Sequence, residues 1–319
     1  MNLPYATSKD PALMKTSTSK HVLGLFRPAS THMVGDGFHV RNLFPSNDLG
    51  EQISPFLLLD YMGPTTYGPT DTPRGVGEHP HRGFETVTIL YQGEIEHRDS
   101  AGNSGKLRPG DVQWMTAASG IVHEEKHERN FAARGGTLQG VQLWVNLPKR
   151  SKMSPPRYQD IPASRIPSVE LPHGAGSVRV IAGELQGVRG PAQTFTPLNV
   201  WDVRLSGTGP GLAPEALSGP ASSSARLEVP EGHIAAAVVL EGEASVVGSP
   251  ALGDAEMVLL SLDGTEVSIE ATKETKLLFL SGVPLGEPVV SHGPFVMNTG
   301  QEIYQAIQDY QSGKMGHLS

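Results

Sequence analysis

Residues 77–97, "GEHPHRGFETVTILYQGEIEH", contain the pattern from which the fold can be predicted. It sets His79 and His81 on either side of Pro80 and then runs through an apolar segment to a turn at Gly93. Side chains two positions apart project from the same side of an extended segment. Proline cannot donate to a sheet ladder and is confined to edges and strand starts. We therefore expect a strand whose two imidazoles share one face, either a solvated face or the interior of a β structure.

The composition favours an all-β protein. The chain has 319 residues, of which 37 are glycine and 26 are proline, and only 18% are charged. Turns are therefore frequent and long exposed helices scarce, as in sandwiches and barrels built from short strands. This length suits two ordinary domains or one large one.

Charge and cysteine content exclude several functions. The net charge is −8 and no Lys/Arg-rich run is visible, which disfavours direct nucleic-acid binding. Without cysteine there is no disulfide, zinc–thiolate site or thiol nucleophile, so a metal must be held by nitrogen and oxygen. The longest wholly apolar run, 234–240, is too short for a bilayer. The N-terminus lacks an apolar core of signal-peptide length. We expect a cytoplasmic protein without membrane contact.

The chain divides into two strand-rich parts. In "GVQLWVNLP" the apolar Val141 and Leu143 alternate with Gln142 and Trp144, a strand with two unlike faces. A proline-rich, charged stretch follows. The predicted organisation is a flexible tail (1–20), a first β domain (21–150), a connector (151–176), a second β domain (177–290) with a mobile loop (206–225), and a terminal segment (291–319).

The two β domains are similar to each other. "YQGEIEH" followed by "RPGDVQWM" in the first domain is matched by "LEGEASV" followed by "ALGDAEMV" in the second. Each places a Gly-Glu turn between apolar strands and a Gly-Asp turn before the next strand. Duplication of one β unit explains this pattern.

The chain is expected to end in a helix, at about 300–312. Thr299 and Glu302 stand at capping-box spacing, and Gly313 supplies a stop. One helical face collects the apolar side chains, so the helix should pack on a β domain; these are Ile303, Ala306, Ile307 and Tyr310.

A second pair of candidate metal ligands, His123 and Glu125, lies in "ASGIVHEEKH", again two residues apart. If both pairs are on strands, three imidazoles and one carboxylate can converge. Neutral imidazoles and one carboxylate would leave a divalent ion with a net charge of about +1, and they suit Fe, Mn, Ni, Cu or Zn. One His-x-His is weak evidence, whereas two such pairs are much stronger.

Four segments together resemble the pirin family, a branch of the cupin superfamily: "HPHRGFETVTIL", "GDVQWMTAASGIVHEE", "GVQLWVNLP" and "HGPFVMNTGQEIYQAIQDY". The resemblance covers residues from about 21 to 313. It implies two cupin-type β-barrels (a bicupin of double-stranded β-helices) with a short C-terminal helix. It also implies one divalent metal per chain, iron(II) first, with Mn, Ni, Cu, Co or Zn as alternatives. The metal would occupy the N-terminal barrel only, held by His79, His81, His123 and Glu125.

Other polar residues receive structural interpretations. Glu85 occupies the glutamate position of the general cupin motif, but the resemblance implies that pirins do not use it as a ligand. His97 is a candidate to face the interior of the first barrel near the metal. His127 continues the odd-numbered alternation of His123 and Glu125. His233, His292, Trp114 and Trp144 are expected to pack. In the second barrel the positions equivalent to the four ligands hold Glu228, Pro230, Glu266 and Ser268, so that barrel should be metal-free.

The resemblance implies a dioxygenase that acts on a flavonol (quercetin-type) or another enolic aromatic substrate with dioxygen. Glu125 is then either a permanent ligand or a general base that accepts the substrate proton, and the sequence leaves both open. The alternative is a non-enzymatic, iron-dependent regulator that binds a protein partner. A metal-dependent isomerase of the sugar-binding cupin type is a third interpretation. We expect a monomer.

Overall fold

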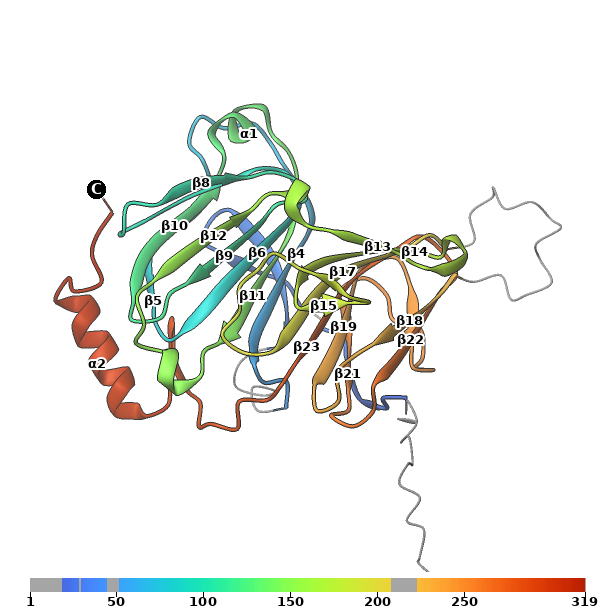
Figure 1. Cartoon of the computed structure of the whole chain (residues 1–319). Coiled ribbons are helices and arrows are strands. Elements are labelled where there is room, and N and C mark those ends of the chain that lie inside the picture. The colour runs from blue at the N-terminus through green and yellow to red at the C-terminus, as the bar shows by residue number, and fades with distance from the viewer. Residues whose placement is uncertain (1–18, 29, 45–51, 208–222, 319) are drawn as a thin grey trace, which may run out of the picture.

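A computed structural model describes residues 19–28, 30–44, 52–207 and 223–318. Almost all of the predicted tail and most of the predicted 206–225 loop lie outside the described residues. The described part is built mainly of β-strands arranged as two barrels side by side (Figure 1). Within these ranges, no helix has the length and apolar character that crossing a membrane requires.

The first barrel consists of a seven-stranded and a four-stranded antiparallel sheet. The larger sheet has the order β12 (Arg157–Ile161), β9 (Val112–Thr116), β6 (Phe84–Gln92), β11 (Gly136–Asn146), β4 (Phe56–Tyr67), β3 (Phe38–Phe44) and β2 (His32–Val34). The smaller sheet has the order β5 (Gly75–His81), β10 (Ile121–His127), β7 (Ile95–Asp99) and β8 (Ser104–Leu107). A short helix, α1 (Arg129–Arg134), follows β10.

The second barrel pairs a seven-stranded sheet with a three-stranded one. The larger sheet has the order β1 (Val22–Phe26), β21 (Glu256–Leu260), β19 (Ile234–Glu241), β23 (Thr275–Gly282), β17 (Leu198–Leu205), β14 (Gly176–Ala182) and β13 (Ser168–Glu170). The smaller has the order β18 (Ser223–Glu228), β22 (Glu266–Ala271) and β20 (Ala244–Val246). Two small ribbons, β15 (Glu184–Leu185) with β16 (Val188–Arg189) and β24 (Val290–His292) with β25 (Phe295–Met297), and three 3₁₀ turns (Lys149–Ser151, Ala163–Arg165, Pro172–Gly174) complete the chain.

The two barrels repeat one topology, as the paired Gly-Glu and Gly-Asp turns predict. The strand order β9-β6-β11-β4 in the first barrel corresponds to β21-β19-β23-β17 in the second, and β5-β10-β7 corresponds to β18-β22-β20. Gly93 and Gly242 occupy equivalent turns, and both have positive φ, at 84° and 98°. Glycine adopts this region without the steric cost that other residues meet.

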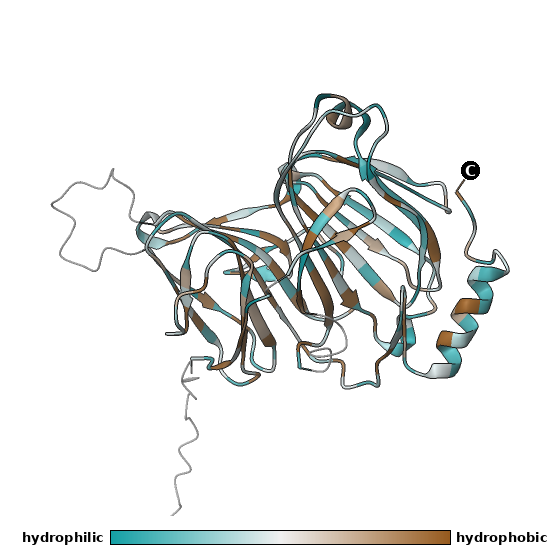
Figure 2. Cartoon of the chain, turned by 180° about the vertical axis from the view of Figure 1, so that it is seen from behind, coloured by the Kyte–Doolittle hydropathy of each residue, from teal (hydrophilic) through white to brown (hydrophobic). Residues whose placement is uncertain are grey.

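The large sheets of the two barrels pack face to face, and this interface forms the largest apolar core. The alternation seen in "GVQLWVNLP" sends Val141 and Leu143 into it, against residues such as Val238 and Leu280 of the second barrel. Tyr61 Oη donates to the Leu240 carbonyl across the interface at 2.7 Å. Figure 2 shows hydrophobic strands running through both barrels. Gln142 and Trp144, on the other face of β11, therefore point into the first barrel.

Two segments cross the predicted domain boundaries. The boundary at residue 21 assigns Val22–Phe26 to the first domain, but β1 pairs with β21 at the edge of the second barrel. The predicted connector, 151–176, contributes β12 to the first barrel and β13 to the second. An edge strand can be recruited from any part of the chain that reaches a free sheet edge, and local sequence does not record which edge it joins.

Near the C-terminus, helix α2 (Gly300–Gln311) lies on the side of the first barrel that faces away from the second barrel (Figure 1). The predicted N-cap is present, since Thr299 Oγ1 accepts from the Glu302 backbone N–H at 3.2 Å, whereas the Glu302 carboxylate accepts from the backbone N–H of Asn298, one residue before the cap, at 3.0 Å. The predicted apolar stripe packs against Val122 of β10, through Ile303 and Ala306. The C-terminal segment therefore covers a strand of the first barrel that carries a candidate metal ligand.

Candidate metal centre

The predicted ligand pairs lie on the neighbouring strands β5 and β10. These strands are antiparallel, with His123 opposite His79 and Ile121 opposite His81. Strand β5 is at the edge of its sheet, where Pro80 is tolerated because no further strand needs its missing N–H. A register irregularity separates His123 from Glu125.

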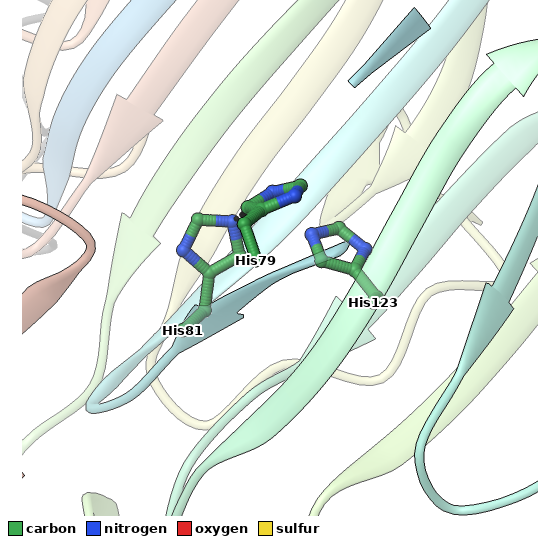
Figure 3. A group of neighbouring side chains, drawn as sticks. All are labelled: His79, His81 and His123. Carbon is green, nitrogen blue, oxygen red and sulfur yellow. Dashed lines mark hydrogen bonds between the residues drawn. The ribbon is translucent and has the colours of Figure 1, made fainter. Parts of the chain in front are cut away.

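The three histidines converge at one point inside the barrel. Figure 3 shows their rings facing one another, with His79 and His81 from β5 and His123 from β10. One nitrogen from each ring lies within 4.8 Å of the others, and Nε2 of His79 is 3.1 Å from Nε2 of His81. His81 and His123 are buried, at 4% and 1% exposed, whereas His79 is half-buried. The site therefore opens toward solvent beside His79.

The surroundings of the three histidine rings suit a bound metal ion. His79 Nδ1 lies 2.8 Å from the Gly77 carbonyl, and His81 Nδ1 lies 3.4 Å from the Pro294 carbonyl, so both rings turn Nε2 toward the shared centre. Carbonyl acceptors of this kind fix the tautomer of metal-binding histidines. Both nitrogens of His123 are buried and find no hydrogen-bond partner among the described residues. An ion at the centre would supply the partner that the buried His123 ring lacks.

The electrostatics favour neutral imidazoles. Burial, reinforced by the neighbouring His79, holds the pKa values of His81 and His123 well below the usual range for histidine. Both rings are therefore unprotonated at neutral pH and offer lone pairs, which is the form that binds metal.

The structure does not bring Glu125 into the histidine group. Its carboxylate instead accepts a hydrogen bond from Gln142 Nε2 at 2.8 Å, and Thr88 Oγ1 lies 3.2 Å from its other oxygen. Burial raises the pKa of Glu125, while His79 and these two hydrogen bonds oppose the shift. Glu125 thus lies beside the three histidines but is engaged by neutral side chains of the opposite wall.

Comparison with known proteins assigns the family. Residues 37–145 match the pirin family model, and residues 217–316 match the model of the pirin C-terminal cupin domain. A Pseudomonas aeruginosa protein named "Putative quercetin 2,3-dioxygenase" is 52% identical over 295 residues, covering 92% of this chain and 98% of its own. The chain belongs to the pirin family. A tomato pirin-like protein is 39% identical over 285 residues, covering 88% of each chain.

The fold of this pirin also matches a solved relative. The crystal structure of a quercetin 2,3-dioxygenase from Acinetobacter baumannii superposes with a TM-score of 0.88 at 48% identity, covering 95% of this chain and all of that one. The two-barrel, bicupin architecture expected from the sequence is therefore confirmed.

Glu85 points away from the histidines of this pirin. Strand β6 alternates, and Glu85 shares the face of Val87 and Ile89, which lies against the other barrel. Its carboxyl group accepts a hydrogen bond from Thr116 Oγ1 at 2.6 Å, and burial raises its pKa to about 7. Glu85 is therefore part of the contact between the barrels.

Two further histidines lie inside the first barrel. His97 of β7 stacks on Tyr158 with ring centroids 4.8 Å apart, and its Nε2 is 2.8 Å from the amide nitrogen of Gln113. Burial lowers the pKa of His97 to about 4. His127 contacts the Gly37 carbonyl through Nε2 at 2.8 Å and packs among aromatic rings, so it closes the barrel rather than joining the site.

The other tryptophans and histidines discussed in the sequence analysis lie in different surroundings. Trp144 packs edge-on against His81, with ring centroids 5.3 Å apart, so it borders the site. Trp114 is fully buried between the barrels, as expected for a core residue. His233 is buried beside Ser281, and His292 is exposed near the C-terminus.

The second barrel has a different interior. Strands β18 and β22 bury Leu227 and Val267, whereas Glu228 and Glu266 lie on their outer face. Trp201 and Phe279 stack in the same core, with ring centroids 5.3 Å apart. The positions equivalent to the four ligands thus lie outside an apolar interior, and within the described residues the three histidines of the first barrel form the one cluster suited to a metal.

Sequence reasoning missed Thr88, Gln142 and Pro294. Gln142 carried a signal, because it lies on the polar face of an alternating strand, but the sequence did not say that this face lines the barrel. Thr88 stands in a nearly continuous apolar strand, and Pro294 lies more than 200 residues from His81.

Proposed function

We propose that this protein is a mononuclear metal dioxygenase, loaded with iron(II), that cleaves an enolic aromatic substrate of the flavonol type. The observation that carries the proposal is the convergence of three buried or half-buried imidazoles on one point, with a carboxylate beside them that is hydrogen-bonded by the neutral side chains of Gln142 and Thr88. His79, His81 and His123 would hold the metal, with Glu125 available as a fourth ligand.

The bound metal would supply a Lewis-acidic centre for the substrate's deprotonated oxygen and for dioxygen. The residues of the chain supply the rest. Trp144 and Phe84 border His81 and offer an apolar wall to a planar ring. Glu125 is placed to accept the proton of the substrate's hydroxyl group, because its carboxylate is buried and makes no ion pair with Lys or Arg among the described residues.

The approach to the site is expected on the His79 side. A cavity of about 40 Å³ borders Glu125 and is lined by Thr88, Gln142, Asp60 and apolar side chains. This volume holds only a few water-sized molecules. It is too small for a flavonol, so we expect the substrate to approach beside the half-buried His79.

The test is turnover under controlled oxygen. Protein purified without added metal is analysed for bound metal, loaded with iron(II) under anaerobic conditions, mixed with quercetin and then exposed to dioxygen. We expect a ring-cleaved product from the wild type, none from His123→Ala, and wild-type turnover from His21→Ala, whose ring is exposed and whose backbone contacts Ser261 of the second barrel. A metal-loaded wild type that leaves quercetin and simpler enols intact would overturn the enzymatic proposal. If that protein instead captured a protein partner only in one iron oxidation state, the regulatory alternative would take its place.

A further inference from the structure

Glu125 is held by a two-residue clamp on the opposite wall of the barrel. Gln142 Nε2 donates to Glu125 Oε2 at 2.8 Å. Thr88 Oγ1 lies 3.2 Å from Glu125 Oε1 and 2.7 Å from Gln142 Oε1. The single hydroxyl proton of Thr88 can serve one of these two acceptors at a time. The clamp therefore binds the carboxylate firmly through Gln142 and adjustably through Thr88.

The clamp is built into the sheet rather than into a loop. Thr88 on β6 and Gln142 on β11 are directly opposite each other in register, and both side chains point into the barrel. Neighbouring side chains of this kind are held in place by the strand pairing itself. The strand pairing thus holds the backbones that carry both clamp residues at a fixed separation.

The clamp and the histidines compete for the same carboxylate. Glu125 follows His123 by two residues on β10, yet its oxygens lie outside the group formed by the three histidine nitrogens. To join that group, the carboxylate must release the Gln142 amide.

We propose that Gln142 and Thr88 are positioning residues that hold Glu125 off the metal, and that Glu125 is therefore a detachable fourth ligand rather than a permanent one. This inference rests on the proposed function, because it takes the three histidines as the metal site. While Glu125 is in the clamp, one more coordination position is open to substrate. When the site has no substrate, Glu125 can occupy that position.

Loss of the clamp should strengthen the bond between Glu125 and the metal. A hydrogen bond to a charged group is stronger than one between neutral groups, and its loss changes a binding equilibrium by about ten-fold or more. We therefore expect metal binding to tighten by roughly ten-fold when Gln142 no longer competes. Turnover should fall at the same time, since the position needed by substrate is filled.

The experiment uses cobalt(II) as the probe, bound to the full-length chain in competition with a chromophoric chelator. The variants are Gln142→Leu and Thr88→Val, the latter nearly isosteric. Gln113→Leu is the matched control, because Gln113 is another inward glutamine but contacts His97 and Tyr158. Thermal unfolding of the metal-free variants checks that each is folded. Visible absorption reports the coordination number, which a purely structural role would not alter.

We expect Gln142→Leu to bind cobalt(II) roughly ten-fold more tightly than the wild type, with the weaker visible bands of a higher coordination number, and Thr88→Val to change in the same direction. Gln113→Leu should match the wild type, and adding Glu125→Gln to Gln142→Leu should abolish the gain. Identical spectra and affinities in the wild type and Gln142→Leu would overturn the proposal, as would a loss of affinity equal to that of Glu125→Gln. If the wild type binds cobalt(II) no better than His123→Ala, the metal site itself fails, and the clamp fails with it.

Discussion

Replacing Arg82 with methionine tests how firmly the C-terminal helix is fastened to the first barrel. Arg82 follows His81, and only 6% of its side chain is exposed. Its guanidinium donates to Asp309 Oδ2 of α2 at 2.9 Å and to the Ser119 carbonyl at 2.6 Å. Methionine retains the apolar stem, but it removes both donors and the charge.

The expected loss follows from the burial of this ion pair. Removing one partner of a buried pair costs about 3–5 kcal/mol. Lys314 lies 2.9 Å from the other oxygen of Asp309 and is 65% exposed, so it can compensate part of the lost charge. We therefore expect the lower end, about 3 kcal/mol of unfolding free energy. In a chain of 319 residues that corresponds to a decrease in Tm of about 4–5 °C.

The assay is urea unfolding followed by tryptophan fluorescence and circular dichroism. Arg189→Met is the control, because the Arg189–Glu184 pair is exposed on both sides and should contribute less than about 1 kcal/mol. The double variant Arg82→Met/Asp309→Leu should lose less than the sum of the two single changes, since neither charge is then buried alone. A loss below about 1 kcal/mol in Arg82→Met, or strict additivity in the cycle, would refute the reasoning.

Three further changes test the site and its surroundings. His123→Ala should reduce bound metal from one per chain to nearly none, whereas His127→Ala should retain it; elemental analysis showing equal metal in both would remove His123 from the site. Burial raises the pKa of Glu85 from its ordinary value of 4.5 to about 7, so the folded state keeps a proton that the unfolded state has lost, and the unfolding free energy should fall by about 3 kcal/mol as the pH rises from about 4.5 to about 7. Urea unfolding of Glu85→Gln at a series of pH values should no longer show this fall. The same dependence of unfolding free energy on pH as in the wild type would contradict the assignment. Gly83→Ala places a Cβ 1.9 Å from the Val296 carbonyl at a φ of +92°, so thermal scans should show a loss of more than about 1 kcal/mol, and an unaltered Tm would show that the close approach is not needed.

The strands and the histidine pairs could be predicted because they are local. Period-two alternation separates the two faces of a strand, and it places Val141 and Gln142 on opposite faces. In the same way, two residues that are two positions apart on a strand, as in each ligand pair, are expected to point to the same side. The repetition of one barrel topology could be predicted from the Gly-Glu and Gly-Asp turns at equivalent places in the two halves. These features depend on residues that are close in sequence.

The clamp and the borrowed strand could not be predicted because they depend on distant residues. Whether the face of Gln142 lines the barrel or the interface is decided by the other sheet that packs on β11. Strand β1 pairs with β21 more than 230 residues away, and a short apolar segment carries no record of its partner. Placing Glu125 outside the histidine group required the positions of both Thr88 and Gln142.

The seating of residues 294–309 against the first barrel has a consequence for how the protein is made. His79 and His81 are synthesised more than 200 residues before the carbonyl that orients His81 and the carboxylate that anchors Arg82. The metal site therefore cannot reach its final geometry until residues 294–309 have been synthesised and have folded back onto the first barrel. A fragment that stops after the first barrel would carry every histidine of the trio and still lack the support that aims one of them.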